Sequence, residues 1–261
     1  MDHPGARLAL TRYSRTAVTR VADDTKKLAM ITNIHIDAGG LSSLPRVGLF
    51  PAATKLLANH NKIEEVRECW AERLEDVDLS DNLLTSFPEI GGTMLLSLNI
   101  SQNRLRDMEI PRLFPNLMEL NCSIQQEKGS PGSVFSPKFS ESLQQHCPRL
   151  QALNISATGI ADLQCVEGFS GLKQLVATRN PIQDLEHVIP YLCDDLLCLD
   201  IQDCPVAKNR RLFEAVCARC PRLVAFNGKK YSAEQIKFSG DKYLREQRRN
   251  AGPGARKKTS E

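Results

Sequence analysis

The sequence has few aromatic residues, a single tryptophan and no long apolar run. Aromatic residues make up 5% of the 261 residues, which indicates a core built from aliphatic side chains rather than from rings. No stretch approaches the roughly 18 apolar residues of a membrane-spanning helix, and no apolar core follows the first residues as in a secretory signal. We therefore expect neither a membrane protein nor a secreted protein.

The sequence also lacks the common motifs of catalysis. It contains no nucleophile elbow, no phosphate-binding loop, no dinucleotide-binding glycine pattern and no paired metal ligands. His35 and His60 have no nucleophile or ligand cluster beside them in the sequence. We therefore predict a protein that is not an enzyme and that holds neither a cofactor nor a metal.

Nine cysteines are present, but their number is odd and their spacing is irregular. This pattern does not indicate a disulfide framework, so we expect reduced thiols in an intracellular protein. The predicted location is the cytoplasm, with a cytoskeletal or ciliary site included and the nucleus as the alternative. Cys217 and Cys220 form a C-x-x-C pair, which has the spacing of half a zinc site.

The formal net charge of +3 is unevenly distributed along the chain. Residues 1–28 carry +3 and residues 229–261 carry +6, so the segment between them carries −6. An acidic body favours a basic protein partner. The basic C-terminal end leaves contact with nucleic acid open as an alternative, although the sequence does not favour it.

A pattern of the form L-x-x-L-x-L-x-x-N-x-L-x-x-L recurs along the chain, and most copies start 21 or 22 residues apart. Within each copy the apolar residues alternate with polar ones, which indicates a strand with one buried face. Self-similarity at this period predicts a leucine-rich repeat solenoid, an α/β fold with a parallel concave sheet and short convex helical or 3-10 segments. The copies start at Ile31, Ala53, Leu74, Leu95, Leu117, Leu150, Leu172, Leu196 and Leu223.

Two columns of the repeat predict the interior. The ninth position is asparagine in four copies, whose side chains are expected to bond buried backbone groups as a ladder: Asn61, Asn82, Asn103 and Asn180. The copy at Leu117 lacks this asparagine. A second column, three residues before each start, alternates phenylalanine with cysteine and includes Cys147 and Cys220. A residue that exchanges with phenylalanine is a packing residue, so we predict that these cysteines belong to the core.

The repeats between Ile31 and Tyr231 resemble a short intracellular leucine-rich repeat class. That class includes the phosphatase-1 regulatory repeat protein and the leucine-rich axonemal dynein light chain. The stretch "NRRLFEAVCARCPRLVAFNGKKYS" resembles its terminal cap, in which a helix leads into a final strand. The resemblance implies a protein-binding adaptor or scaffold, a monomer within a larger cytoskeletal, ciliary or phosphatase-regulatory assembly. A ribonucleoprotein or chromatin-associated subunit is the alternative.

The predicted organisation has four parts. Residues 1–30 form a basic N-terminal segment and cap, 31–209 the repeats, 210–231 the C-terminal cap, and 232–261 a helix followed by a disordered basic tail. Gly240 is expected to interrupt that helix, and a segment rich in glycine, serine and proline at 124–140 is expected to be an exposed loop. The arginine-rich N-terminus also resembles a mitochondrial targeting segment, an alternative to a capping helix.

The third, fifth and seventh positions of each copy are expected to point out of the concave face. Their side chains are mostly small, carboxamide or acidic, which suits a trough that seats a basic helix or strand of a partner protein. With Arg179 from an eighth position, the predicted partner-binding residues are Asp76, Asp78, Ser97, Asn99, Ser101, Glu119, Asn121, Asn154, Gln174, Arg179 and Asp200.

Overall fold

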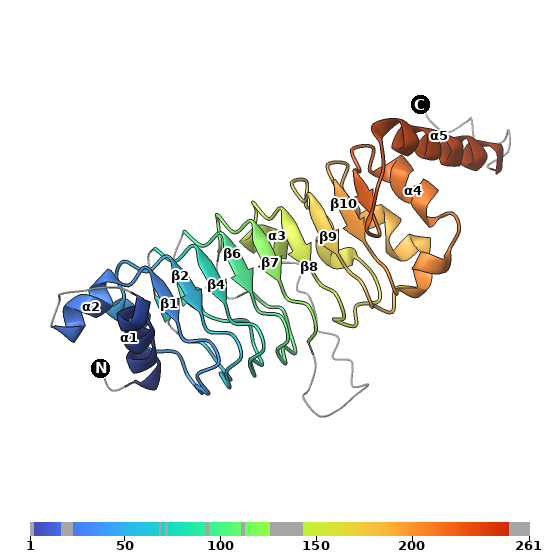
Figure 1. The fold of residues 1–261 in the computed structure, drawn as a ribbon. Helices are drawn as coiled ribbons and strands as arrows, with labels where there is room; N and C mark the ends of the chain where they lie inside the picture. The colour runs from blue at the N-terminus through green and yellow to red at the C-terminus, as the bar shows by residue number, and fades with distance from the viewer. Residues whose placement is uncertain are drawn as a thin grey trace, which may run out of the picture. The chain divides into compact units, whose positions relative to one another are not determined.

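The computed structural model describes residues 3–16, 23–67, 69–70, 73–91, 94–110, 113–125 and 143–250. The chain divides into two compact units, Met1–Ile160 and Ala161–Glu261. Each unit is a stack of repeat turns that contribute short strands to a parallel sheet (Figure 1). Most of the insertion expected at 124–140 and the tail after residue 250 lie outside the described residues. Within the described ranges, no helix has the length and apolarity needed to cross a membrane.

The sheet of the first unit has one three-residue strand per repeat. Its parallel order is β1 (Asn33–His35), β2 (Lys55–Leu57), β4 (Asp76–Asp78), β6 (Ser97–Asn99), β7 (Glu119–Asn121) and β8 (Ala152–Asn154). Equivalent repeat positions face one another, so Val77 lies opposite Leu98. The central residue of every strand is buried and its neighbours are less so, because successive side chains of a strand point to opposite faces.

The second unit continues the repeat with β9 (Gln174–Val176), β10 (Cys198–Asp200) and β11 (Ala225–Phe226), which are parallel. A final strand, β12 (Lys229–Lys230), pairs antiparallel with β11. The outer side of this unit carries 3-10 helices, as the repeat pattern predicts. They are η2 (Gln164–Val166), η3 (Leu185–His187), η4 (Ile189–Tyr191) and η5 (Pro205–Lys208).

The outer side of the first unit differs in part from the prediction. A 3-10 helix, η1 (Val47–Leu49), and a short helix, α3 (Leu143–His146), agree with it. Between them, β3 (Cys69–Trp70) and β5 (Ile90–Gly91) instead form a two-stranded parallel sheet. Both strands belong to repeats of only 21 residues, and extended backbone spans a given distance with fewer residues than a helical turn does.

Two helices precede the first strand: α1 (Pro4–Thr16) and α2 (Asp24–Met30). The carboxylate of Asp23 caps α2 by accepting a hydrogen bond from the Thr25 N–H at 2.9 Å. Arg12 of α1 donates to the Asp37 carboxylate at 2.5 Å and to the Asp37 carbonyl at 2.8 Å. Ala6, Ala9 and Leu28 are buried, so these helices cover apolar surface at the start of the stack.

Two helices lie near the C-terminal end of the second unit: α4 (Leu212–Arg219), between β10 and β11, and α5 (Ala233–Asn250), after β12. Ser232 and Gln235 cap α5 reciprocally, with the Ser232 N–H donating to Gln235 Oε1 at 2.9 Å and the Gln235 N–H donating to Ser232 Oγ at 3.3 Å. The helix runs unbroken through Gly240, in contrast to the expected interruption. A Cβ at Gly240 would lie 2.9 Å from the Cys217 carbonyl oxygen, so glycine there permits the close approach of α4 and α5.

Candidate functional site

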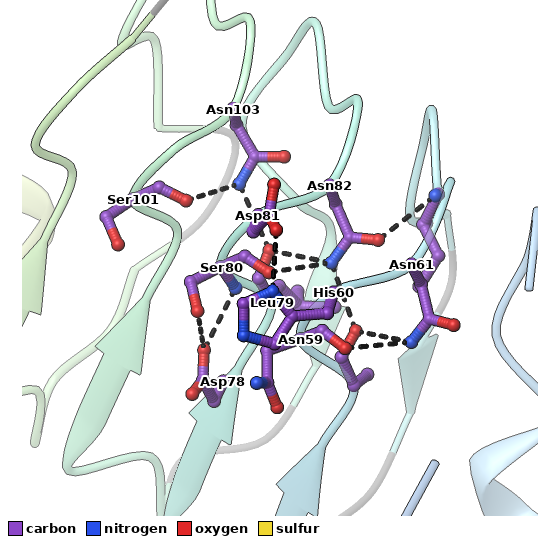
Figure 2. A network of polar contacts seen from close by, with 12 residues as sticks. Asn59, His60, Asn61, Asp78, Leu79, Ser80, Asp81, Asn82, Ser101 and Asn103 are labelled. Carbon is purple, nitrogen blue, oxygen red and sulfur yellow. Dashed lines mark hydrogen bonds and ion pairs between the residues drawn. The ribbon is translucent and has the colours of Figure 1, made fainter. Parts of the chain in front are cut away.

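A ladder of carboxamide side chains supports the strand ends of the first unit (Figure 2). Asn82 Nδ2 donates to the carbonyls of Ala58 and Leu79 at 3.0 Å each, and its Oδ1 accepts from the Ile63 N–H at 3.1 Å. Asn61 and Asn103 repeat this arrangement one turn before and one turn after. Each amide therefore ties its own turn to the preceding one and satisfies backbone groups that water cannot reach.

The ladder does not stop where the asparagine column stops. In the copy at Leu117, Gln125 Nε2 donates to the Ile100 and Cys122 carbonyls at 3.1 and 3.0 Å, and Oε1 accepts from the Leu105 N–H at 3.1 Å. The sequence pattern missed this residue, although its carboxamide at the ninth position was a usable signal. In the second unit Asn180 donates to the Ala177 carbonyl at 3.0 Å, and Cys204 takes the same place one turn later.

The residue before each ladder position has a left-handed backbone. These residues are not glycine, and their φ angles lie between 48° and 59°: Ala38, His60, Asp81, Gln102, Ile124, Ala157, Arg179 and Asp203. This conformation is uncommon without glycine, so it marks a turn that the fold imposes at the same point of the first eight repeats. Such turns can place side chains in contact across neighbouring repeats, as for His60 Nδ1, which lies 2.6 Å from Asp81 Oδ2 (Figure 2).

The fifth repeat position forms a second polar column on the exposed face of the first unit's sheet. Asn99 Oδ1 accepts hydrogen bonds from the N–H and the Oγ of Ser101, at 3.2 and 2.8 Å. The same pair of bonds joins Asn121 to Ser123, and the Ser156 N–H donates to Asn154 Oδ1 at 3.0 Å. Because the carboxamide oxygen of each asparagine accepts these bonds, its Nδ2 donor is the group directed away from the turn.

Four serines at the seventh repeat position do not point out of the face as predicted. Ser80, Ser101, Ser123 and Ser156 are only 5–8% exposed, and the first three donate their hydroxyls to the fifth-position side chain of their own repeat. Ser101 is therefore a support for Asn99 rather than a surface contact. The physical reason is that a short hydroxyl two residues after an Asx side chain closes a local turn instead of reaching solvent.

The third repeat position is the outermost on these strands. Ser97 is half-buried and Glu119 is exposed, and the two lie opposite each other on β6 and β7. Asp76 is also half-buried, but its Oδ2 lies 2.6 Å from Lys55 Nζ on the neighbouring strand. Asp78 accepts both hydrogen bonds of Ser80 at 2.9 and 2.6 Å. Asp76 and Asp78, two of the acidic side chains predicted to bind a partner, therefore already have partners within the protein.

In the second unit, three residues were predicted to bind a partner. Gln174 and Arg179 are exposed, and Asp200 on β10 is half-buried. Asp200 Oδ1 accepts from the Gln202 N–H at 3.1 Å, and Oδ2 accepts from Gln202 Nε2 at 3.2 Å. This is the same Asx turn that holds the fifth-position side chains of the first unit.

Cys147 and Cys220 of the column that alternates with phenylalanine, together with Cys217 of α4, are packing residues, as predicted. Cys147, Cys217 and Cys220 are at most 3% exposed. Burial raises the pKa of these thiols from 9.0 to about 12, and that of Cys69 equally. They are therefore protonated at neutral pH, the form that suits an apolar core. Cys193, by contrast, is half-buried in the same column.

No protein-family model and no curated protein sequence matches the chain. Among solved structures, internalin C2 from Listeria monocytogenes strain 4b F2365 is similar in fold, with a TM-score of 0.64 at 16% sequence identity. The match covers 86% of this chain and 92% of internalin C2. A weaker similarity links 37% of this chain to 66% of a chain from the Chaetomium Mex67:Mtr2 subunits, with a TM-score of 0.30 and 18% identity.

The similarity to internalin C2, a leucine-rich repeat protein, extends over most of both chains. Together with the parallel sheet and one strand per repeat, it shows the fold class that the sequence pattern predicts. The chain therefore has the leucine-rich repeat solenoid fold.

Proposed function

We propose that this protein is a non-enzymatic adaptor that binds a partner protein on the exposed strand face of its first unit. The row of carboxamides on β6, β7 and β8 carries the proposal. Asn99, Asn121 and Asn154 occupy one register position on three adjacent parallel strands, and their serine contacts fix the direction of each amide. A partner meets donors that are already ordered, so little side-chain entropy is lost on binding.

The spacing of this row suits a helical partner. Adjacent strands lie about 4.8 Å apart, and one turn of an α-helix advances about 5.4 Å. A helix laid across the strands therefore offers about one side chain per strand to the three amides. Glu119 and Asp78 flank the row and favour a partner with basic residues beside its acceptor side chains.

The assembly that this adaptor serves belongs to the same proposal. We assign it to the short intracellular repeat class, within a cytoskeletal, ciliary or phosphatase-regulatory complex, on the strength of the repeat and cap patterns. All nine cysteines are free thiols, which supports a reducing, cytoplasmic compartment.

The test is quantitative affinity capture with the full chain and two double variants. Ser97→Arg with Glu119→Arg places two long cations on the third repeat position without touching the Asx turns. Ser86→Arg with Glu109→Arg makes the same change in charge at exposed residues outside the strands. Partner proteins recovered with the wild type and the control, but lost with the strand variant, support the proposal. Equal recovery with all three chains contradicts it.

A second candidate function rests on the end of α5. Arg245, Arg248 and Arg249 are exposed there, and such a cluster suits phosphate contacts with nucleic acid. Deleting residues 251–261 and replacing these arginines by alanine tests it. If these residues contact phosphates, RNA retention should weaken and should depend less steeply on the salt concentration. The deletion begins after Asn250, since a longer one would remove the part of α5 that packs on α4.

A further inference from the structure

A cavity of about 710 Å³ lies in the first unit, away from the exposed strand positions. Its walls come from the segments that follow β1, β2, β4 and β6, and none of the predicted concave-face residues lines it. Four repeats therefore contribute to one hollow on a different surface from the carboxamide row. Its lining combines aliphatic side chains with charged ones, so it can contact both apolar and charged groups of a ligand.

Arg104 is the distinctive residue of this cavity. Its backbone N–H donates to the Leu84 carbonyl at 2.9 Å, so the repeat fixes where the side chain starts. Its Nε is buried and makes no hydrogen bond within the part of the chain that the structure describes. A buried donor without an acceptor is unfavourable, and it leaves the guanidinium of Arg104 incompletely paired. Arg104 as a whole is half-buried and lines the cavity, so a ligand can approach this guanidinium from the cavity.

The other charges of the cavity select the kind of acceptor. Arg67 Nη2 lies 2.8 Å from Glu65 Oε2, so this pair is neutral as a unit. Glu64 offsets one of the two remaining arginines, Arg46 and Arg104, and leaves one net positive charge. That balance suits a single carboxylate, which arginine binds through paired N–H donors. A phosphate dianion carries more negative charge than this balance offsets.

The aliphatic lining selects what accompanies the carboxylate. Val47 and Val66 are buried in the wall, and Leu44 and Leu83 are half-buried. These side chains can cover apolar groups of a ligand on either side of its charged one. We propose that this cavity is a second protein-binding site, which takes an acidic side chain flanked by aliphatic residues of a partner segment, with Arg104 as the carboxylate ligand.

The test is an NMR titration of the full chain with three acetylated, amidated tripeptides, Val-Glu-Val, Val-Gln-Val and Val-phosphoserine-Val, at constant ionic strength. The Glu peptide should shift the Arg104 Nε–H signal in a saturable manner, together with the amides of Val66 and Leu83. The Gln peptide, equal in shape but uncharged, should bind at least about tenfold more weakly, the effect expected of one charge-assisted hydrogen bond.

Two variants locate the effect. Arg104→Gln should weaken binding of the Glu peptide by about tenfold or more, whereas Arg106→Gln, the same charge change at an exposed residue outside the lining, should leave it unchanged. If Arg104→Gln does not fold, Arg46→Gln at the exposed end of the lining replaces it, with a smaller loss expected. Equal binding of the Glu and Gln peptides, tighter binding of the phosphoserine peptide, or an equal effect of Arg104→Gln and Arg106→Gln would each overturn the proposal.

Discussion

The Oδ1 atom of Asn82 accepts a hydrogen bond from the backbone N–H of Ile63, nineteen residues earlier and one turn back in the stack, at 3.1 Å. The same side chain donates to carbonyls of both turns. One carboxamide thus couples two repeats, and a column of them couples successive turns of the first unit. The half-buried amides of Asn99, Asn121 and Asn154 on the strand face depend on the turns that this column supports.

Replacing Asn82 by alanine is expected to lower the free energy of unfolding by at least about 2 kcal/mol, because it leaves buried backbone groups without partners. Urea unfolding followed by circular dichroism measures the change. Asn33→Ala, at an exposed residue of β1, is the control and should change stability by no more than about 0.5 kcal/mol. Similar losses for the two variants would show that the ladder has no special role.

Gln125 is expected to be as important as the asparagines, although its residue type breaks the pattern. Gln125→Ala removes bonds to Leu105, Ile100 and Cys122 and should cost at least about 2 kcal/mol of unfolding free energy. Gln145→Ala, on the exposed face of α3, should be nearly neutral. A neutral Gln125→Ala would mean that backbone groups of this turn find other partners.

Gly240→Ala tests the contact between α4 and α5 by the sign of its effect. Helix propensity alone predicts a gain of about 1 kcal/mol for alanine in a helix interior. The added Cβ would instead lie 2.9 Å from the Cys217 carbonyl oxygen, so we expect a net loss of about 1–3 kcal/mol. Thermal unfolding of the variant beside Ser239→Ala measures it, and a rise in stability would contradict the described packing.

The buried thiols predict a loss of stability in alkali. Below pH 9 the thiols are protonated in both folded and unfolded chains, so they add no pH dependence. Above pH 9 the unfolded chain loses these protons, while the folded chain keeps them up to about pH 12 at Cys69, Cys147, Cys217 and Cys220. Stability should therefore fall between pH 9 and 12.

Cys147→Ala separates this effect from other alkaline titrations. The variant lowers stability at pH 8 by its lost packing, but the further loss between pH 8 and pH 10 should be smaller than in the wild type by about 1 kcal/mol. Urea unfolding at the two pH values gives both numbers. An unchanged difference between pH 8 and pH 10 would show that the Cys147 thiol is not shielded as described.

The sequence predicts the repeat register because period-two apolar residues and the asparagine column both depend only on local spacing. It predicts Cys147 and Cys220 as core residues for the same reason, since their column alternates with phenylalanine. It does not predict the extended β3 and β5. Whether the outer side of a repeat forms a strand or a 3-10 turn depends on the number of residues available to span that side, and the leucine and asparagine positions do not specify this conformation.

The candidate site is predicted less completely than the fold. Positions three and five are exposed or half-buried on the strand face as expected, but the burial of Ser101 follows from a hydroxyl that closes a turn with Asn99. The pairing of Asp76 with Lys55 joins residues 21 apart, which only the stacked register brings together. The cavity around Arg104 combines four repeats and has no local signature in any of them.

The most direct measurement of the central claim is a calorimetric titration of the partner recovered by capture against the wild type and the two double variants. We predict that Ser97→Arg with Glu119→Arg raises the dissociation constant by about a hundredfold or more, because two desolvated cations would face the partner. Ser86→Arg with Glu109→Arg should leave it within about twofold. A dissociation constant unchanged by the strand-face variant would contradict the assignment of this face as the partner-binding surface.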